Sequence, residues 1–146
     1  GGGAGGGGGG LCFGTVDSWL IHRLTGGAAH VTDATNAART MLMELETQTW
    51  HQPTLDALGI PLAAMPKIVS CAEAELGVIT QGALAGVPIT GCLGDQHAAT
   101  LGQRCRVGEA KNTYGTGCFM LLNTGDRAVP STHGLLTTMA WKLGPG

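Results

Sequence analysis

The segment from residue 86 to residue 101 constrains the fold most, because an apolar run passes directly into the start of a helix. Residues 86–93 predict a buried strand, and residues 97–101 predict the first turns of a helix. Gly94, Asp95 and Gln96 lie between the two. In open α/β sheets, ligands bind outside the carboxyl ends of the strands. The segment therefore predicts an α/β protein with a ligand-binding edge at Asp95.

Asp95 is the first candidate for chemistry. The start of the next helix would help to keep its carboxylate ionised, and an ionised Asp placed on a hydroxyl group can act as a general base. Gln96 can both donate and accept hydrogen bonds, which suits a polyol hydroxyl. Residue types alone leave a second interpretation open, in which Asp95 only caps the helix.

A second candidate lies between two β-rich arms, residues 111–114 and 118–122, which predict a hairpin around Gly115, Thr116 and Gly117. Glycines let backbone amides approach an anion closely, and the Thr116 hydroxyl adds a donor. The turn is thus a candidate phosphate cradle, although a plain hairpin turn is the preferred interpretation of these three residues taken alone. Phe119 either covers a carbon face of a substrate or packs within the hairpin. A base and a phosphate cradle together are parts that phosphoryl transfer needs.

The remaining segments predict an alternation of short helices and extended pieces. Residues 14–27 predict a helix that Thr15 caps, with an apolar face turned to the core. That face consists of Val16, Trp19, Leu20 and Leu24. Extended pieces are predicted at 30–32, 40–45 and 65–69, and a short helix at 53–58.

A polar loop is predicted at 33–39, between the first two extended pieces. Its Arg39 could point at a phosphate, but pairing with Asp33 is the preferred interpretation.

Composition excludes several classes of function. The formal net charge is −2, and the sequence has no stripe of basic residues. Both features argue against nucleic-acid binding. No apolar run approaches the roughly 18 residues of a membrane span. The five cysteines and five histidines are scattered, so no metal site is predicted, and the cysteines are expected to be small buried residues of a reducing cytoplasm. Residues 1–10 are glycine apart from Ala4 and predict a low-complexity leader.

From about Leu11 to Leu143, the chain resembles the FGGY family of carbohydrate kinases. The matching stretches follow in order: 13–21, 30–33, 35–37, 39–42, 94–96, 110–119 and 134–138. The run at 110–119 is the most specific of them. The resemblance implies a partial actin-like ATPase (ribonuclease H-like) fold of the α/β class. It implies that 11–104 end the N-terminal substrate domain and that 108–146 begin the C-terminal nucleotide domain.

The resemblance also implies an activity: transfer of the γ-phosphoryl group of ATP to glycerol, giving sn-glycerol 3-phosphate, with Mg²⁺. By position, Asp95 resembles the catalytic base and a glycerol ligand, Gln96 a second glycerol ligand, and Phe119 the aromatic wall of the glycerol pocket. Gly115, Thr116 and Gly117 resemble the residues around the nucleotide phosphates. A related sugar or polyol kinase, such as a pentulokinase, is the alternative. A second alternative is that the chain is a truncated, non-catalytic fragment that can only bind ligands.

Two positions depart from the family pattern. Ala38 stands where serine is usual and His97 where glutamine or serine is common, and neither is expected to change the function. The family's other active-site residues should precede Leu11 or follow Gly146. The resemblance further implies a cytoplasmic enzyme that forms a homo-oligomer in its full-length form.

Overall fold

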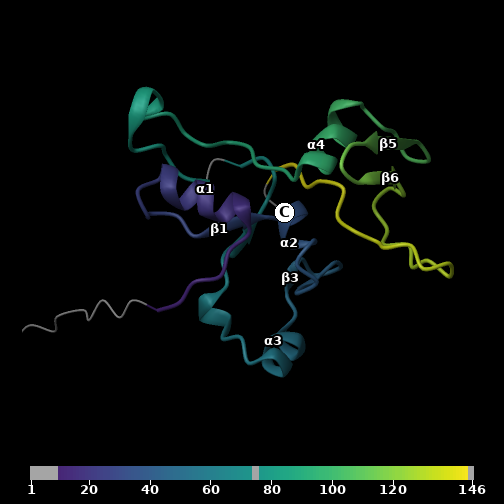
Figure 1. The fold of residues 1–146 in the computed structure, drawn as a ribbon, viewed down its shortest axis with the longest axis horizontal. Coiled ribbons are helices and arrows are strands. Elements are labelled where there is room, and N and C mark those ends of the chain that lie inside the picture. Colours follow the sequence, from purple (N-terminus) through teal and green to yellow (C-terminus); the bar gives the residue numbers. More distant parts are fainter. Residues whose placement is uncertain (1–9, 74–75, 145–146) are drawn as a thin grey trace, which may run out of the picture.

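A computed structural model describes residues 10–73 and 76–144, and Figure 1 shows their arrangement. The helices and strands are α1 (Val16–Leu24), β1 (Val31–Asp33), α2 (Ala34–Ala37), β2 (Met43–Glu44), β3 (Thr49–Trp50), α3 (Gln52–Leu58), β4 (Lys67–Val69), α4 (Asp95–Gly102), β5 (Ala110–Tyr114) and β6 (Cys118–Leu122). Two short 3-10 helices lie at Leu62–Ala64 and Gly82–Leu84. The predicted leader falls outside the described residues except for Gly10, which is exposed.

Strands pair only two by two among the described residues. β1 pairs with β4 in parallel, with Val31 opposite Lys67 and Asp33 opposite Val69. β2–β3 and β5–β6 are antiparallel pairs. The parallel pair confirms the prediction of an α/β arrangement, because parallel strands need a long crossover between them.

Helix α1 turns a different face to the interior from the one its apolar spacing predicts. Asp17, Ser18 and Ile21 are buried, whereas Trp19 is 62% exposed and Leu20 53% exposed. The expected core role of Trp19 is therefore wrong, and the Arg23 guanidinium lies 5.6 Å from its ring centroid. The physical reason is that Asp17 accepts hydrogen bonds from strand β1, and this polar contact fixes the rotation of the helix.

Two small apolar clusters form the core. Ile21 of α1 packs with Val31, Val69 and Leu76. In the second cluster, Leu42, Leu55 and Met65 pack together, with Phe13, Trp50 and Ile60 against them. The second cluster holds α3, which confirms the predicted short helix at 53–58, against the extended chain around Met65.

The strand predicted at 86–93 does not form. This segment is irregular apart from an isolated bridge between Val78 and Pro88, and most of its residues are exposed. Pro88 lacks the N–H that a ladder needs, and Gly86 has a φ of 87°, outside the range of a strand. Helix α4 nevertheless forms after this segment, but it begins at Asp95, two residues before the predicted start at residue 97.

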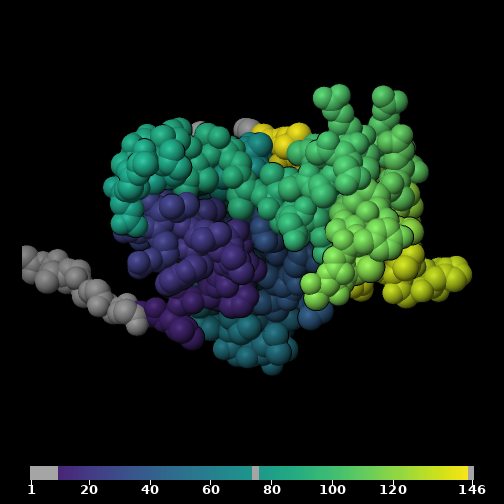
Figure 2. Space-filling model, turned by 45° about the horizontal axis from the view of Figure 1, so that its top comes forward, coloured from purple at the N-terminus to yellow at the C-terminus, as the bar shows by residue number. Residues whose placement is uncertain are grey.

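The predicted hairpin is confirmed. β5 and β6 pair over five residues each, from Ala110 opposite Leu122 to Tyr114 opposite Cys118. Figure 1 shows the hairpin beside α4, on the side away from α1, and Figure 2 shows it projecting from the rest of the molecule. After β6 the chain runs outward and then returns to the centre, where the Cys71 amide donates to the Lys142 carbonyl at 2.9 Å.

The cysteines are not all buried, in contrast to the expectation from the sequence. Cys71 and Cys105 are buried, as predicted, but Cys12 and Cys118 are exposed, and all five cysteines are free. No helix among the described residues has the length and apolar character needed to cross a membrane.

Candidate functional site

A cavity of about 570 Å³ lies between helix α1, the segment before α4 and the start of α4. We refer to it as the α1–α4 cavity. Its lining contains Val16, Asp17, Leu20, Ile21, Leu24, Asn36, Arg39, Ile89, Gly91, Cys92, Leu93, Gly94, Asp95, Gln96 and His97. One wall is therefore apolar, and the polar side chains gather where α4 begins, which is a typical composition for a small-molecule site.

Asp95 is the first residue of α4 and is exposed at this cavity. Its Oδ1 atom accepts a hydrogen bond from the Gln96 amide at 2.7 Å. The capping position belongs to Gly94, whose own amide donates to the Thr35 hydroxyl at 2.8 Å. The carboxylate therefore lies at the N-terminal end of the helix, and its Oδ2 accepts no hydrogen bond among the described residues. Gln96 follows it in the lining of the same cavity.

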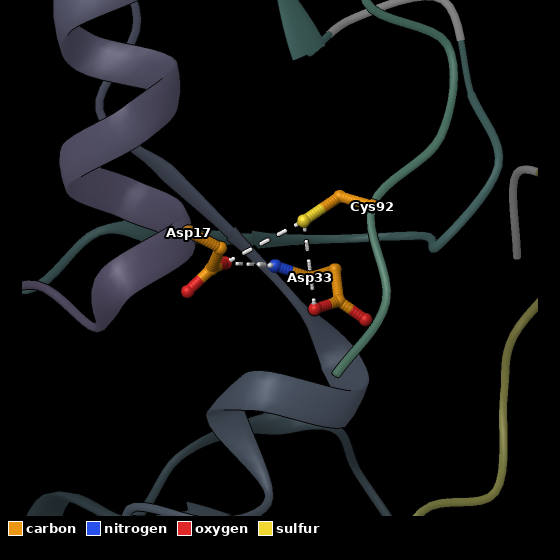
Figure 3. Close-up of side chains that lie close together, drawn as sticks. All are labelled: Asp17, Asp33 and Cys92. Carbon is orange, nitrogen blue, oxygen red and sulfur yellow. Dashed lines mark hydrogen bonds between the residues drawn. The ribbon is translucent and has the colours of Figure 1, made fainter. Parts of the chain in front are cut away.

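Beside this cavity lies a polar network around Asp17 and Asp33, which are buried, and Cys92, which is half-buried (Figure 3). Asp17 and Cys92 also line the cavity. Asp33 Oδ2 accepts from the Thr35 amide and hydroxyl at 2.8 and 2.7 Å, and its Oδ1 accepts from the Asn36 side chain at 2.6 Å. Asp17 Oδ2 accepts from the Thr32 hydroxyl at 2.8 Å and from the Asp33 amide at 3.2 Å. Asp33 thus caps α2, which forms in place of the polar loop predicted at 33–39.

Carboxylate and thiol atoms of Asp17, Asp33 and Cys92 lie within 4.8 Å of one another, a spacing that could hold a metal ion. The bonding opposes that use, because both carboxylates already accept from protein donors. Burial, reinforced by the negative charges of Asp33 and Asp17, raises the pKa of the Cys92 thiol to about 12. A thiol must lose its proton to bind a metal. The group therefore acts as a structural network that fixes α1, β1 and α2 beside the cavity.

Arg39 lines the α1–α4 cavity and does not pair with Asp33. Within the described part of the chain, the Asp33 carboxylate is occupied by Thr35, Asn36 and thiol donors, and no ion pair involves Arg39. The preferred interpretation of Arg39 as a structural partner is therefore wrong. The reason is local: the capping bonds of α2 use both oxygens of Asp33, and the guanidinium is left exposed.

His97, which the sequence marks only as a neutral departure from the family pattern, also lines the cavity. Its side chain is only 3% exposed, and neither ring nitrogen has a hydrogen-bond partner among the described residues. Burial lowers the pKa of this imidazole. The sequence signal for it was its departure from the family pattern, directly after Asp95 and Gln96.

The hairpin turn lies apart from this cavity, whose lining includes none of Gly115, Thr116, Gly117 and Phe119. All four of these residues are exposed. The Gly115 amide donates to the Gly117 carbonyl at 3.1 Å, so this amide is engaged within the turn. A Cβ atom at Gly117 would lie 2.8 Å from the Phe119 ring, which shows how closely the ring covers the turn. The structure thus brings Asp95 and Gln96 together and leaves the phosphate candidates on a separate surface.

Comparison with known proteins identifies the class of this chain. Residues 9–102 match the N-terminal domain of the FGGY family of carbohydrate kinases. The match covers more than half of the chain, which therefore belongs to this family, and the α/β, actin-like fold class expected from the resemblance is confirmed.

The curated relatives are more specific. A protein of Arabidopsis thaliana named glycerol kinase is 61% identical over 91% of this chain and 26% of its own length. The glycerol kinase of Nocardia farcinica is 60% identical over the same shares. This chain therefore spans about a quarter of the length of the relatives it matches.

Solved structures agree with these relatives. The crystal structure of Plasmodium falciparum glycerol kinase with ADP superposes with a TM-score of 0.82 and 41% identity, over 88% of this chain and 26% of that one. Ligand-bound xylulose kinase from Lactobacillus acidophilus gives a TM-score of 0.59 and 28% identity, over 71% of this chain and 22% of that one.

Proposed function

We propose that the full-length protein containing this chain transfers the γ-phosphoryl group of ATP to glycerol, with Asp95 as the general base. The observation that carries the proposal is the open carboxylate of Asp95 at the start of α4, facing a cavity that Gln96 shares. The relatives named glycerol kinase, at 61% and 60% identity, support glycerol as the acceptor.

The chemistry follows from the position of these side chains. The Asp95 carboxylate accepts the proton of a glycerol hydroxyl as the hydroxyl oxygen forms its bond to the γ-phosphorus, and ADP leaves with the electrons of the broken P–O bond. Gln96 would orient the polyol through one donor and one acceptor. Such catalysis consists mainly of positioning and charge neutralisation, so the proposed task of Asp95 and Gln96 is to place the acceptor hydroxyl and take its proton.

We assign the nucleotide phosphates to the hairpin turn, with Thr116 as a hydroxyl donor and Gly115 and Gly117 as the close-approach positions. Exposure of Gly115, Thr116 and Gly117 supports this assignment, because a phosphate could reach the turn. Phe119 lies against Gly117, and we assign its ring to the carbon face of the bound glycerol.

Mg²⁺ would accompany ATP, because this ion is usually held by one or two carboxylates together with substrate phosphates and water. It would supply neutralisation of phosphate charge. Oδ1 of Asp95 accepts from the Gln96 amide and Oδ2 is assigned to the glycerol hydroxyl, so no residue of this chain is proposed as a ligand of the ion.

A kinase of the same family acting on a sugar is the second candidate, favoured by the likeness to xylulose kinase. ATP turnover by the full-length protein with glycerol, ribitol and D-xylulose separates the two. The proposal predicts the highest kcat/KM with glycerol. Equal or better turnover with D-xylulose would overturn it.

By itself, this chain is expected to bind at most, because it spans about a quarter of the length of its relatives. Glycerol-dependent ATP consumption by the purified chain would contradict that expectation. The five free cysteines support a reducing compartment such as the cytoplasm. Assembly of the full-length protein into a homo-oligomer stays a prediction, which analytical ultracentrifugation tests.

A further inference from the structure

We propose that His97 is an additional ligand-binding residue of the α1–α4 cavity, and that its imidazole hydrogen-bonds a hydroxyl group of the phosphoryl acceptor. The proposal rests on the proposed function, since it assumes a hydroxyl-bearing acceptor at Asp95. It adds a third polar contact to those expected from Asp95 and Gln96.

The first observation is an unpaired polar side chain in the interior. His97 is 3% exposed, and both Nδ1 and Nε2 lack a hydrogen-bond partner among the described residues. Buried polar atoms in folded proteins are nearly always paired, because desolvation without a partner is costly. His97 is also one of the residues that line the cavity, beside Asp95 and Gln96. A ligand in that cavity would supply the missing partner.

The second observation is that the chain leaves room for the ring at this place. A Cβ atom on Gly94 would lie 2.9 Å from His97 Nδ1 and 3.6 Å from the Thr35 hydroxyl oxygen. Thr35 is not a free partner, since its hydroxyl donates to Asp33 Oδ2 at 2.7 Å and accepts from the Gly94 amide at 2.8 Å. The backbone of His97 is fixed as well, because its amide donates to the Gly94 carbonyl at 3.0 Å.

The charge state of the ring matches a hydroxyl ligand. Burial lowers the pKa of His97 below its ordinary value of 6.5, with help from Arg39 and Lys111 and against the opposing charges of Asp33 and Asp95. The ring is therefore mainly neutral at pH 7. A neutral imidazole has one donor and one acceptor, and a hydroxyl also donates once and accepts. Asp95 would remain the group that takes the proton.

The direct test uses the unmodified full-length protein with 15N-labelled histidine. The 15N resonances of the ring report hydrogen bonding at each nitrogen, and His97→Gln assigns the signal that disappears. Saturating glycerol is expected to shift at least one ring nitrogen of His97 and to leave the exposed His133 unchanged. Unchanged His97 resonances at saturation would overturn the proposal.

Kinetics of variants give an independent readout. His97→Leu removes both hydrogen-bonding atoms and is expected to raise the glycerol KM by about fivefold or more, with the ATP KM within about twofold. His97→Gln keeps a donor and an acceptor and should fall between wild type and His97→Leu. His133→Gln, at an exposed position outside the cavity lining, is the matched control.

Failure of this proposal differs from failure of the proposed function. If the wild-type protein phosphorylates D-xylulose or ribitol in place of glycerol, the proposed substrate is wrong, and the His97 variants are measured with the accepted substrate. An acceptor KM within about twofold of wild type in a folded His97→Leu variant would mark the residue as core packing alone.

Discussion

Buried thiols beside two carboxylates should be almost inert towards alkylation. Burial is the largest cause that raises the pKa of Cys71 to about 12, and the negative charge of Asp33 adds to it. The pKa of Cys92 is raised to about 12 in the same way, with Asp17 contributing as well. Both thiols donate towards Asp33, at 3.1 Å from Cys71 and 4.0 Å from Cys92.

The expected rate follows from the fraction of thiolate, which is the reactive form. At pH 8, a thiol with the ordinary pKa of 9.0 is about 10% ionised, whereas one at about 12 is ionised to about 0.01%. Iodoacetamide should therefore modify Cys71 and Cys92 about 1000-fold more slowly than an ordinary thiol, before any steric protection. The exposed Cys12 and Cys118 provide the comparison within the same chain.

The assay is timed alkylation followed by mass spectrometry of each cysteine peptide. Between pH 7 and pH 10, the rates at Cys71 and Cys92 should climb about tenfold per pH unit, because both stay below their pKa. In urea, all five cysteines should react alike. Folded-state rates for Cys71 and Cys92 within about tenfold of those for Cys12 and Cys118 would refute the buried network.

The same rise in thiol pKa determines how the stability of the fold depends on pH. A thiol whose pKa is higher in the folded state stabilises the fold fully below its unfolded pKa of 9.0, and this contribution is lost as pH rises towards about 12.

Three further predictions concern the hairpin turn at 115–117, the apolar core and the network around Asp33. In the full-length protein, Thr116→Ala should raise the ATP KM by about fivefold and leave the glycerol KM within about twofold; the reverse pattern would exclude the phosphate role. Leu55→Ala should lower the free energy of unfolding by about 2 to 5 kcal/mol, measured by urea denaturation with Trp50 fluorescence, because Leu55 is fully buried. Leu58→Ala, at a 62% exposed position of the same helix, should change the free energy by less than about 0.5 kcal/mol, and equal losses would contradict the packing. Asp33→Ala should cost roughly 3 kcal/mol by the same assay, since several buried donors lose their acceptor, and a loss below about 1 kcal/mol would contradict the network.

Local signals made the hairpin predictable, and helix α4 to within two residues of its start. The glycine turn at 115–117 sets the register of β5 and β6 through contacts within a few residues. Helix α4 starts where Gly94 gives way to Asp95, a change that is visible in the sequence. Short-range chemistry of this kind needs no knowledge of the partner elements.

The features that were not predicted depend on contacts between residues far apart in the sequence. Asp17 accepts a hydrogen bond from Thr32, which is 15 positions away in the sequence, and this contact sets the rotation of α1. The apolar spacing of Trp19 and Leu20 therefore predicted the wrong buried face. Residues 86–93 have the composition of a strand, but Pro88 and the φ of 87° at Gly86 leave no continuous ladder. His97 can be buried because Gly94 has no side chain where it approaches His97 and Thr35. No hydrophobic periodicity in the sequence indicates this contact.

The role of Asp95 as the base of phosphoryl transfer is tested most directly by Asp95→Asn in the full-length protein, which keeps the shape of the side chain and removes its basicity. We measure glycerol-dependent formation of ADP at saturating substrates, together with the ATP KM. A general base contributes about 100-fold to 10,000-fold, so kcat is predicted to fall by at least about 100-fold, with the ATP KM within about threefold. A fall of less than about tenfold would contradict the assignment of Asp95 as the base.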